Sequence, residues 1–267
     1  MCAKWYAQRG FTTESVRKAR SWYLRFIPEC GNLLDLGCGR GEFLESAASA
    51  GHQVLGLDHD TTMLDQVNEH PTHHGEALDY LQSISTHFDT ITAFHVIEHF
   101  PVPEAAALVR LAADRLRPGG RLIIATPNPG SLPTITHEFW RDPTHVRPYD
   151  TDLIEYLTRE SGLTTESSGL NPESELGLPV NLNDLRLEPP LNPEPSSRRD
   201  ALATRWVSRQ MADSAYGENL ERTIHATADG LLHTRQELER IASLLHRFLE
   251  VAYEPSEIYV VARRSSG

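Results

Sequence analysis

The sequence contains little cysteine, with three residues in 267. Cys2, Cys30 and Cys38 have neither the spacing of a metal site nor the even number that a disulfide framework requires. This usage fits a reducing compartment, because disulfides persist mainly in oxidising ones. We therefore expect three buried or inactive thiols.

Basic side chains are also scarce relative to acidic ones. Lys and Arg number 25 against 37 Asp and Glu, which gives a formal net charge of -12. Binding to nucleic acid depends on clustered Lys and Arg that displace counterions from phosphates. The charge balance therefore argues against a nucleic-acid partner.

Long hydrophobic runs are absent. No apolar segment reaches the roughly 18 residues that a membrane-spanning helix needs. The opening residues, MCAKWYAQRG, lack the apolar centre of a signal peptide. We therefore expect a cytoplasmic protein with no membrane span, and its hydrophobic share of 39% is enough to form a core.

Strand-like and helical patterns alternate between residues 32 and 126. In chain order the segments are NLLDL, EFLESAASA, QVLGL, TTMLDQVNE, FDTITAFHV, PEAAALVRLAADRL and GRLIIAT. This alternation predicts βαβ units, hence a parallel sheet in an α/β fold with helices on both faces. Further helices are expected from Thr13 and from Thr151, a plausible N-cap, and a strand at 163–169. The segment EIYVVARR has the character of a last edge strand.

The composition changes after residue 170. Six prolines between residues 171 and 195 indicate an irregular loop, and helical patterns follow from about 198 to 252. Within the latter, apolar residues at spacings of 3, 4 and 7 form a seam for helix packing, namely Leu231, Leu238, Ile241, Leu245, Phe248 and Ala252. The seam predicts either a lid helix packed on its own domain or a homodimer contact. We expect a core of residues 1–169 and 257–267, with a helical cap at 1–30, and an insertion at 170–256.

A glycine-rich loop follows the first predicted strand in LLDLGCGRGEF. Gly37, Gly39 and Gly41 give the pattern GxGxG, which differs from the GxGxxG of dinucleotide-binding loops. Glycines allow positive φ angles and let the backbone approach a ligand closely. Asp35 ends the strand before this loop, and Asp58 ends the next strand. This combination resembles the class I S-adenosylmethionine-dependent methyltransferases.

The resemblance runs from about residue 4 to 169, and the strand at 257–262 would complete the seven-stranded, Rossmann-like sheet of that family. It implies that the cofactor is S-adenosylmethionine. Residues 37–39 would contact its methionine moiety, Asp58 and His59 the ribose, Met63 the adenine face and residues 76–77 the adenine edge. An arginine in YAQRG would clamp the cofactor carboxylate. The implied cofactor residues are Arg9, Asp35, Gly37, Cys38, Gly39, Asp58, His59, Met63, Glu76, Ala77, Phe94 and His95.

The reaction centre is expected where the strand in AFHVIEHFP ends, because ligands of such sheets lie at the carboxyl ends of strands. A hydroxyl acceptor needs a base or a cation beside it at neutral pH. His95, Glu98 and His99 resemble the ExxEH motif of quinone O-methyltransferases and small-RNA 2'-hydroxyl methyltransferases, which binds a divalent cation with a distant histidine. Here His95 replaces the first Glu. Three alternatives stay open: a cation such as Mg²⁺ held by Glu98, His99 and His145; His99 or His145 as general base, oriented by Glu98; or a cluster with a purely structural role.

A loop of unusual composition, TPNPGSLPTITHEFWRDPTHVRPYD, spans residues 126–150. It resembles the loop over the transferable methyl in methyltransferases of bacterial surface glycans, including polymannose chain-terminating enzymes. Aromatic side chains there could stack on a sugar ring, and charged ones could bond its hydroxyls. The candidate substrate residues are Trp140, Arg141, Asp142, Arg147 and Tyr149, with Phe139 beside Trp140.

These patterns favour an O-methyltransferase acting on a hydroxyl of a saccharide or glycoconjugate. An O-methyltransferase of a natural product or quinone-like acceptor, or of a glycan phosphate, is the alternative. An RNA acceptor is disfavoured by the acidic charge. A hypothesis of another class is a catalytically silent methyltransferase fold that binds a partner through its insertion. The acceptor itself cannot be derived from the fold.

Overall fold

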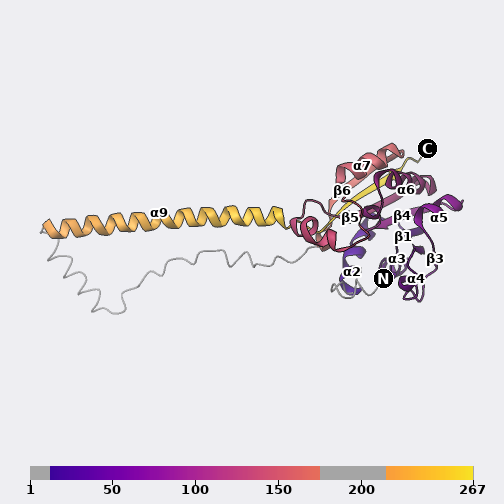
Figure 1. Ribbon diagram of the computed structural model, residues 1–267, viewed down its shortest axis with the longest axis horizontal. Coiled ribbons are helices and arrows are strands. Elements are labelled where there is room, and N and C mark those ends of the chain that lie inside the picture. Colours follow the sequence, from indigo (N-terminus) through magenta and orange to yellow (C-terminus); the bar gives the residue numbers. More distant parts are fainter. Residues whose placement is uncertain (1–12, 175–214, 267) are drawn as a thin grey trace. The chain divides into compact units, whose positions relative to one another are not determined.

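The computed structural model describes residues 13–174 and 215–266, and every structural statement below refers to these residues. The chain divides into two compact units, one of residues 1–177 with 252–267 and one of residues 178–251. The boundaries expected from the sequence were 169 and 257. The first unit is an α/β domain, and the described part of the second is a single helix, α9 (Figure 1).

The α/β unit is built on a seven-stranded sheet in the order β3-β2-β1-β4-β5-β7-β6, which confirms the predicted fold class. Strands β1 to β5 are parallel, whereas β7 is antiparallel to both β5 and β6. The strands are β1 (Asn32–Leu36), β2 (Gln53–Asp58), β3 (Thr72–His74), β4 (Phe88–Phe94), β5 (Leu116–Pro127), β6 (Leu163–Leu170) and β7 (Glu257–Arg264).

The prediction of an edge strand at 257–264 was wrong. β7 lies between β5 and β6, and its first six residues are all buried. β6 forms the edge instead, and its burial alternates along the strand. The physical reason is that EIYVVA is apolar on both faces, which suits an interior strand covered on both sides.

Helices cover both faces of the sheet. Helices α5 (Ala77–Ser83), α6 (Val102–Arg115) and α7 (Thr151–Glu160) bury one apolar cluster, while α3 (Glu42–Ser49) and the 3-10 turn η1 (Trp22–Phe26) bury the other (Figure 1). Neighbouring strand residues point to opposite clusters: Leu33 and Leu34 separate in this way, as do Ile123 and Ile124. The doubled apolar residues of the sequence therefore fill two cores.

Several local predictions need adjustment. The helix from Thr13 ends at Ser21 as α2, and the chain continues in η1. Of the helix expected in TTMLDQVNE, only α4 (Thr61–Leu64) forms. The N-cap of α7 is Asp150, whose carboxylate accepts from the backbone N–H of Leu153. The strand β3 was not predicted, because its sequence THH is polar.

The two ends of the insertion meet beside the sheet. The backbone N–H of Asn171 donates to the carbonyl of Glu257 at 3.0 Å, and that of Ser256 donates to the carbonyl of Ser174 at 3.2 Å. The chain therefore leaves β6 and returns to β7 at one place.

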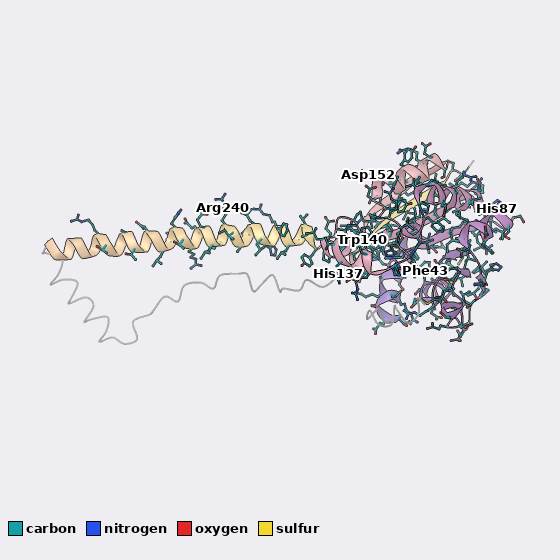
Figure 2. All side chains as sticks on the ribbon, viewed as in Figure 1. Phe43, His87, His137, Trp140, Asp152 and Arg240 are labelled. Carbon is teal, nitrogen blue, oxygen red and sulfur yellow. The ribbon has the colours of Figure 1, made fainter. Side chains whose placement is uncertain are left out.

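In the second unit, α9 runs from Ala215 to Ala252. Figure 2 shows its side chains standing along its length, with Arg240 labelled. The apolar residues expected to form a seam are exposed between Leu231 (67%) and Phe248 (58%). Within the described ranges, no helix is both long and apolar enough to cross a membrane.

Candidate active site

The glycine loop connects β1 to α3 and is tied to the end of β2. Gly37 and Gly39 have φ angles of +68° and +56°, which side chains with a Cβ rarely adopt. A Cβ on Gly37 would meet Val96, whereas the corresponding position on Gly39 faces open space. The N–H of Gly39 donates to Oδ2 of Asp58 at 2.8 Å. The carboxylate of Asp58 therefore fixes the position of the loop, while the space next to the Cα of Gly39 stays open.

Asp35 lies beneath this loop and is buried to 2% exposure. Its carboxylate accepts a 2.6 Å hydrogen bond from the hydroxyl of Thr92 on the neighbouring strand β4. Burial raises the pKa of Asp35 to about 7, although the Thr92 bond opposes the shift. Burial therefore disfavours the ionised form of the Asp35 carboxyl relative to its protonated form.

The other predicted cofactor residues lie around the ends of β2, β3 and β4. Met63 is buried, His59 and Glu76 are exposed, and Ala77 opens α5. Cys38 is buried, and burial raises the pKa of its thiol. Phe94 is the last residue of β4 and stacks on Tyr23 with ring centroids 4.7 Å apart. Arg9 lies outside the described residues.

Glu98 occupies the 3-10 turn η2 (Ile97–His99) that follows β4, and it is fully buried. Its Oε2 accepts a 2.9 Å hydrogen bond from the hydroxyl of Thr126 at the end of β5. Its Oε1 has no hydrogen-bond partner among the described residues. A buried carboxylate oxygen that accepts no hydrogen bond lowers the stability of the fold, so this oxygen is a candidate to bind a ligand.

His99 and His145 present free lone pairs beside this carboxylate. Nδ1 of His145 lies 2.7 Å from the carbonyl oxygen of Phe139, and Nδ1 of His99 lies 3.0 Å from the hydroxyl oxygen and 3.2 Å from the carbonyl oxygen of Thr144. A carbonyl only accepts, and the Thr144 hydroxyl already donates to Asp142, so each ring donates through Nδ1 and in its neutral form has its lone pair on Nε2. Burial lowers the pKa of His145, which favours its neutral form.

These three side chains can hold a metal ion. Glu98, His99 and His145 each offer a ligand atom, and these atoms all lie within 4.8 Å of one another. Two imidazole nitrogens and one carboxylate oxygen suit a transition metal better than Mg²⁺, which prefers oxygen ligands. The structure thus brings together all three residues predicted for catalysis or metal binding.

His95 borders this cluster but is not one of the three residues that form it. Its φ angle is +57°, and its ring lies between two carboxylates. Nε2 contacts Oε2 of Glu257 at 2.6 Å, and Nδ1 lies 3.3 Å from Oε1 of Glu98. His95 is therefore a neighbour of the cluster and is not among its ligand-bearing residues.

The loop from 128 to 149 places its candidate substrate residues unequally. Trp140, labelled in Figure 2, is 62% exposed. Its ring packs edge-on against the buried ring of Phe139. Arg141 is exposed and pairs with Glu138 at 3.3 Å. Trp140 and Arg141 are thus accessible to a large acceptor.

Three other predicted substrate residues are engaged within the fold. Asp142 is buried and accepts from the N–H and hydroxyl of Thr144; burial alone would raise its pKa, but these hydrogen bonds help to lower it. Tyr149 is fully buried and donates to the carbonyl of Phe100. The guanidinium of Arg147 lies over the Tyr149 ring. Asp142 and Tyr149 therefore shape the loop from within.

Glu257, a buried carboxylate that pairs with Pro127 at the end of β5, was not identified from the sequence. Glu257 accepts hydrogen bonds from Arg20 at 2.5 Å, Tyr23 at 2.5 Å and Asn171 at 2.8 Å, besides the contact with His95. The guanidinium of Arg20 also lies 4.8 Å from the centroid of the Phe94 ring. The available signal was a lone charge that opens the apolar run of β7.

Comparison with known proteins shows which family the chain resembles. A family model described as "Methyltransferase domain" matches residues 8–168. Among curated proteins, the Ubiquinone biosynthesis O-methyltransferase of Yersinia pestis (strain Pestoides F) is 36% identical over 104 residues. That match covers 36% of this chain and only 42% of the relative's length.

Solved structures show the same fold. A SAM-dependent methyltransferase from Archaeoglobus fulgidus superposes with a TM-score of 0.66 at 18% identity, covering 97% of each chain. Phosphoethanolamine N-methyltransferase 2 of Haemonchus contortus gives a TM-score of 0.51 at 18% identity, covering 94% of this chain and 52% of that one. At such identities the likeness concerns the fold.

Proposed function

The chain belongs to the methyltransferase-domain family, and on that premise we propose that it transfers a methyl group from S-adenosylmethionine to a hydroxyl of a saccharide or glycoconjugate. Family membership supports a methyltransferase, the class of enzyme that the resemblance implies. S-adenosylmethionine as the cofactor, the type of acceptor and the residues that act on it form the proposal.

The observation that carries the proposal is that ligand atoms of Glu98, His99 and His145 all lie within 4.8 Å of one another. Oε1 of Glu98 is buried without a hydrogen bond from any described residue, and Nδ1 of each histidine is engaged in a hydrogen bond, which leaves its Nε2 as the nitrogen for a ligand. A general base needs one lone pair, whereas a cation needs several. We therefore assign these residues to a divalent transition metal.

The proposed chemistry is an in-line displacement. The acceptor oxygen forms a bond to the methyl carbon, and the carbon–sulfur bond of the sulfonium breaks with its electrons left on sulfur. A bound cation lowers the pKa of a hydroxyl that it contacts. The acceptor hydroxyl releases its proton to solvent water. The residues of this chain position the acceptor, and positioning supplies much of the rate.

The cofactor is proposed to lie along the ends of β1, β2 and β4. The open side of Gly39 leaves room for its methionine moiety, and Asp58 is placed for the ribose hydroxyls. The half-buried guanidinium of Arg20 lies beside Phe94 at the end of β4 and is a candidate to face the carboxylate of the cofactor, a role first assigned to Arg9. We retain His59, Met63 and residues 76–77 for the adenosine.

A saccharide acceptor is supported by the exposed part of the loop. Trp140 presents a large ring at 62% exposure, and the adjacent Arg141 carries a charge that can bond hydroxyls or a phosphate. The Trp140 ring is braced by Phe139, which also contacts the ring of His145 at 4.5 Å. A sugar stacked on Trp140 would therefore lie next to Phe139, which in turn contacts His145, one of the proposed metal ligands.

The second candidate acceptor is a quinone-like or other small aromatic alcohol. Two findings favour it: the curated relative carries the name Ubiquinone biosynthesis O-methyltransferase, and Leu132 and Val146 add exposed apolar surface to the same loop. The cluster of Glu98, His99 and His145 would serve either acceptor in the same way.

We also propose that α9 mediates a homodimer. Leu238, Ile241, Leu245 and Phe248 follow a heptad pattern and are all exposed. Such a pattern in a helix of 38 residues is typical of helix-on-helix association.

The test of function is transfer of labelled methyl from S-adenosylmethionine to fractions of the source cells, with and without a chelator. Label in a glycan that resists mild alkali would support a methyl ether, and alkali-labile label would indicate an ester of phosphate or carboxylate. Label in the organic-soluble fraction would select the quinone-like acceptor. Chelator-sensitive transfer, lost in Glu98→Gln and His145→Ala but kept in His137→Ala, supports the cation; chelator-resistant transfer would refute it.

A further inference from the structure

Glu257 is a buried carboxylate that joins four separate parts of the α/β unit. It accepts hydrogen bonds from Arg20 of α2, Tyr23 of η1 and Asn171 after β6, and it contacts His95 after β4. Burial alone would raise the pKa of Glu257, but the charge of Arg20 and the bond from His95 outweigh it and hold the pKa well below its ordinary value. The group is therefore a fixed negative charge.

The contact with His95 is the one that reaches the proposed reaction centre. Nε2 of His95 lies 2.6 Å from Oε2 of Glu257, while Nδ1 lies 3.3 Å from Oε1 of Glu98. Despite that short distance, Oε1 has no hydrogen bond from any described residue. The ring is thus held near Glu98 in an orientation that does not satisfy its free oxygen.

This geometry has a physical consequence for the cluster. An oxygen that accepts a hydrogen bond from a neighbouring imidazole has one lone pair fewer for a cation. A ring released from Glu257 would turn to donate to Oε1, because an unpaired buried carboxylate oxygen is costly. The clamp on Nε2 opposes that turn.

We propose that Glu257 is a positioning residue that clamps His95 and so keeps Oε1 of Glu98 available to the bound cation. The inference rests on the proposed function, since it concerns the cation site of Glu98, His99 and His145. Outer groups that orient metal ligands typically change metal affinity by roughly 10- to 100-fold when they are removed.

The experiment measures Co²⁺ binding by visible absorption, with no acceptor present. Glu257→Gln should weaken Co²⁺ binding by about tenfold or more, because His95 then competes for Glu98. His95→Ala should bind Co²⁺ about as well as the wild type. The decisive variant combines both changes: with the competing ring gone, Glu257→Gln should no longer weaken binding.

A matched control is Tyr23→Phe, which removes another hydrogen bond to the same carboxylate but leaves His95 in place. It should lower the free energy of unfolding without changing Co²⁺ affinity. If Tyr23→Phe weakens Co²⁺ binding as much as Glu257→Gln does, the effect is a general loss of structure and the proposal fails.

A spectroscopic reading covers the case in which Glu257→Gln does not fold. The short His95–Glu257 bond predicts a strongly downfield imidazole N–H resonance in the wild type that disappears in His95→Ala. Its absence from the wild type would overturn the clamp. Wild-type protein that binds no Co²⁺ would overturn the cation site itself, whereas tight binding in both wild type and Glu257→Gln would overturn only the role of Glu257.

Discussion

The hydroxyl of Thr126 donates a 2.9 Å hydrogen bond to Oε2 of Glu98, so the end of β5 fixes the carboxylate that follows β4. Both residues are fully buried. The carbonyl of Glu98 accepts the backbone N–H of Val146 at 2.8 Å, which attaches the long loop to the same residue. One residue therefore connects the sheet, the loop and the proposed cation site.

The first prediction concerns this bond. Thr126→Val should lower the free energy of unfolding by about 1–3 kcal/mol, because it leaves Oε2 of Glu98 buried without its donor. Thr90→Val is the matched control, since the buried hydroxyl of Thr90 has no partner among the described residues, and its removal should be neutral or stabilising. Urea denaturation of both variants decides the point; equal losses of stability would contradict it.

The second prediction concerns cofactor affinity. Asp58→Ala should weaken S-adenosylmethionine binding by about 10- to 100-fold, because it removes the acceptor of the Gly39 N–H and the proposed acceptor of a ribose hydroxyl. Titration calorimetry measures the dissociation constant. Asp65→Ala, at an exposed position after α4, should leave it unchanged. Unaltered affinity in Asp58→Ala would remove this residue from the site.

The third prediction concerns pH. Asp35 has an ordinary pKa of 3.8 and a pKa of about 7 in the fold, so the folded protein holds this proton where the unfolded chain has lost it. The free energy of unfolding should therefore fall as the pH rises from about 5 to about 8, by on the order of 2–3 kcal/mol from this group. The low pKa of Glu257 contributes no slope there, because its stabilisation is lost only below its ordinary pKa of 4.5.

Denaturant unfolding of Asp35→Asn at several pH values checks the assignment. The variant should lose most of this slope, since an amide does not titrate. If the slope of the wild type is kept in Asp35→Asn, another group is responsible.

The fourth prediction separates acceptor binding from chemistry. Trp140→Ala should raise KM for a saccharide acceptor by about tenfold while leaving kcat nearly unchanged, because in the proposed function the exposed ring binds the sugar away from the reacting atoms. Trp140→Phe should recover part of the loss. Tyr156→Ala, an exposed aromatic on α7, serves as the control. A fall in kcat alone would argue against a binding platform.

The fifth prediction concerns α9. Combined Leu238→Asp and Ile241→Asp should convert a homodimer into a monomer, as measured by sedimentation, because charges at seam positions cannot be buried against a second helix. Ser243→Asp places a charge on the same helix outside the seam and should keep the dimer. A wild-type chain that sediments as a monomer would refute the proposed contact.

The sequence predicts the parts of this molecule that depend on local patterns. The alternation of strand-like and helical patterns identifies β1, β2, β4 and β5, and the glycine loop falls between β1 and α3, after the strand that the sequence predicts. β3 escaped prediction because its three polar residues lack a strand pattern. The interior position of β7 escaped because strand order depends on pairing between distant segments.

The candidate site divides in the same way. Glu98 and His99 are adjacent in the sequence, and His145 was found through its loop. By contrast, Glu257 meets Arg20 across 237 positions of the chain, and no local pattern joins them. Burial also separated residues that look alike in sequence: Trp140 is exposed, whereas its neighbour Phe139 is in the core.

The hydrogen bond between Ser174 and Ser256 makes the junction of the insertion a natural graft point. Because the chain departs and returns at one place, a short Gly/Ser linker in place of residues 178–251 leaves the strand pairing of β6 with β7 intact. We therefore expect the α/β unit to keep its fold when the insertion is shortened or replaced at this junction, because the sheet and its two apolar clusters lie outside the replaced residues.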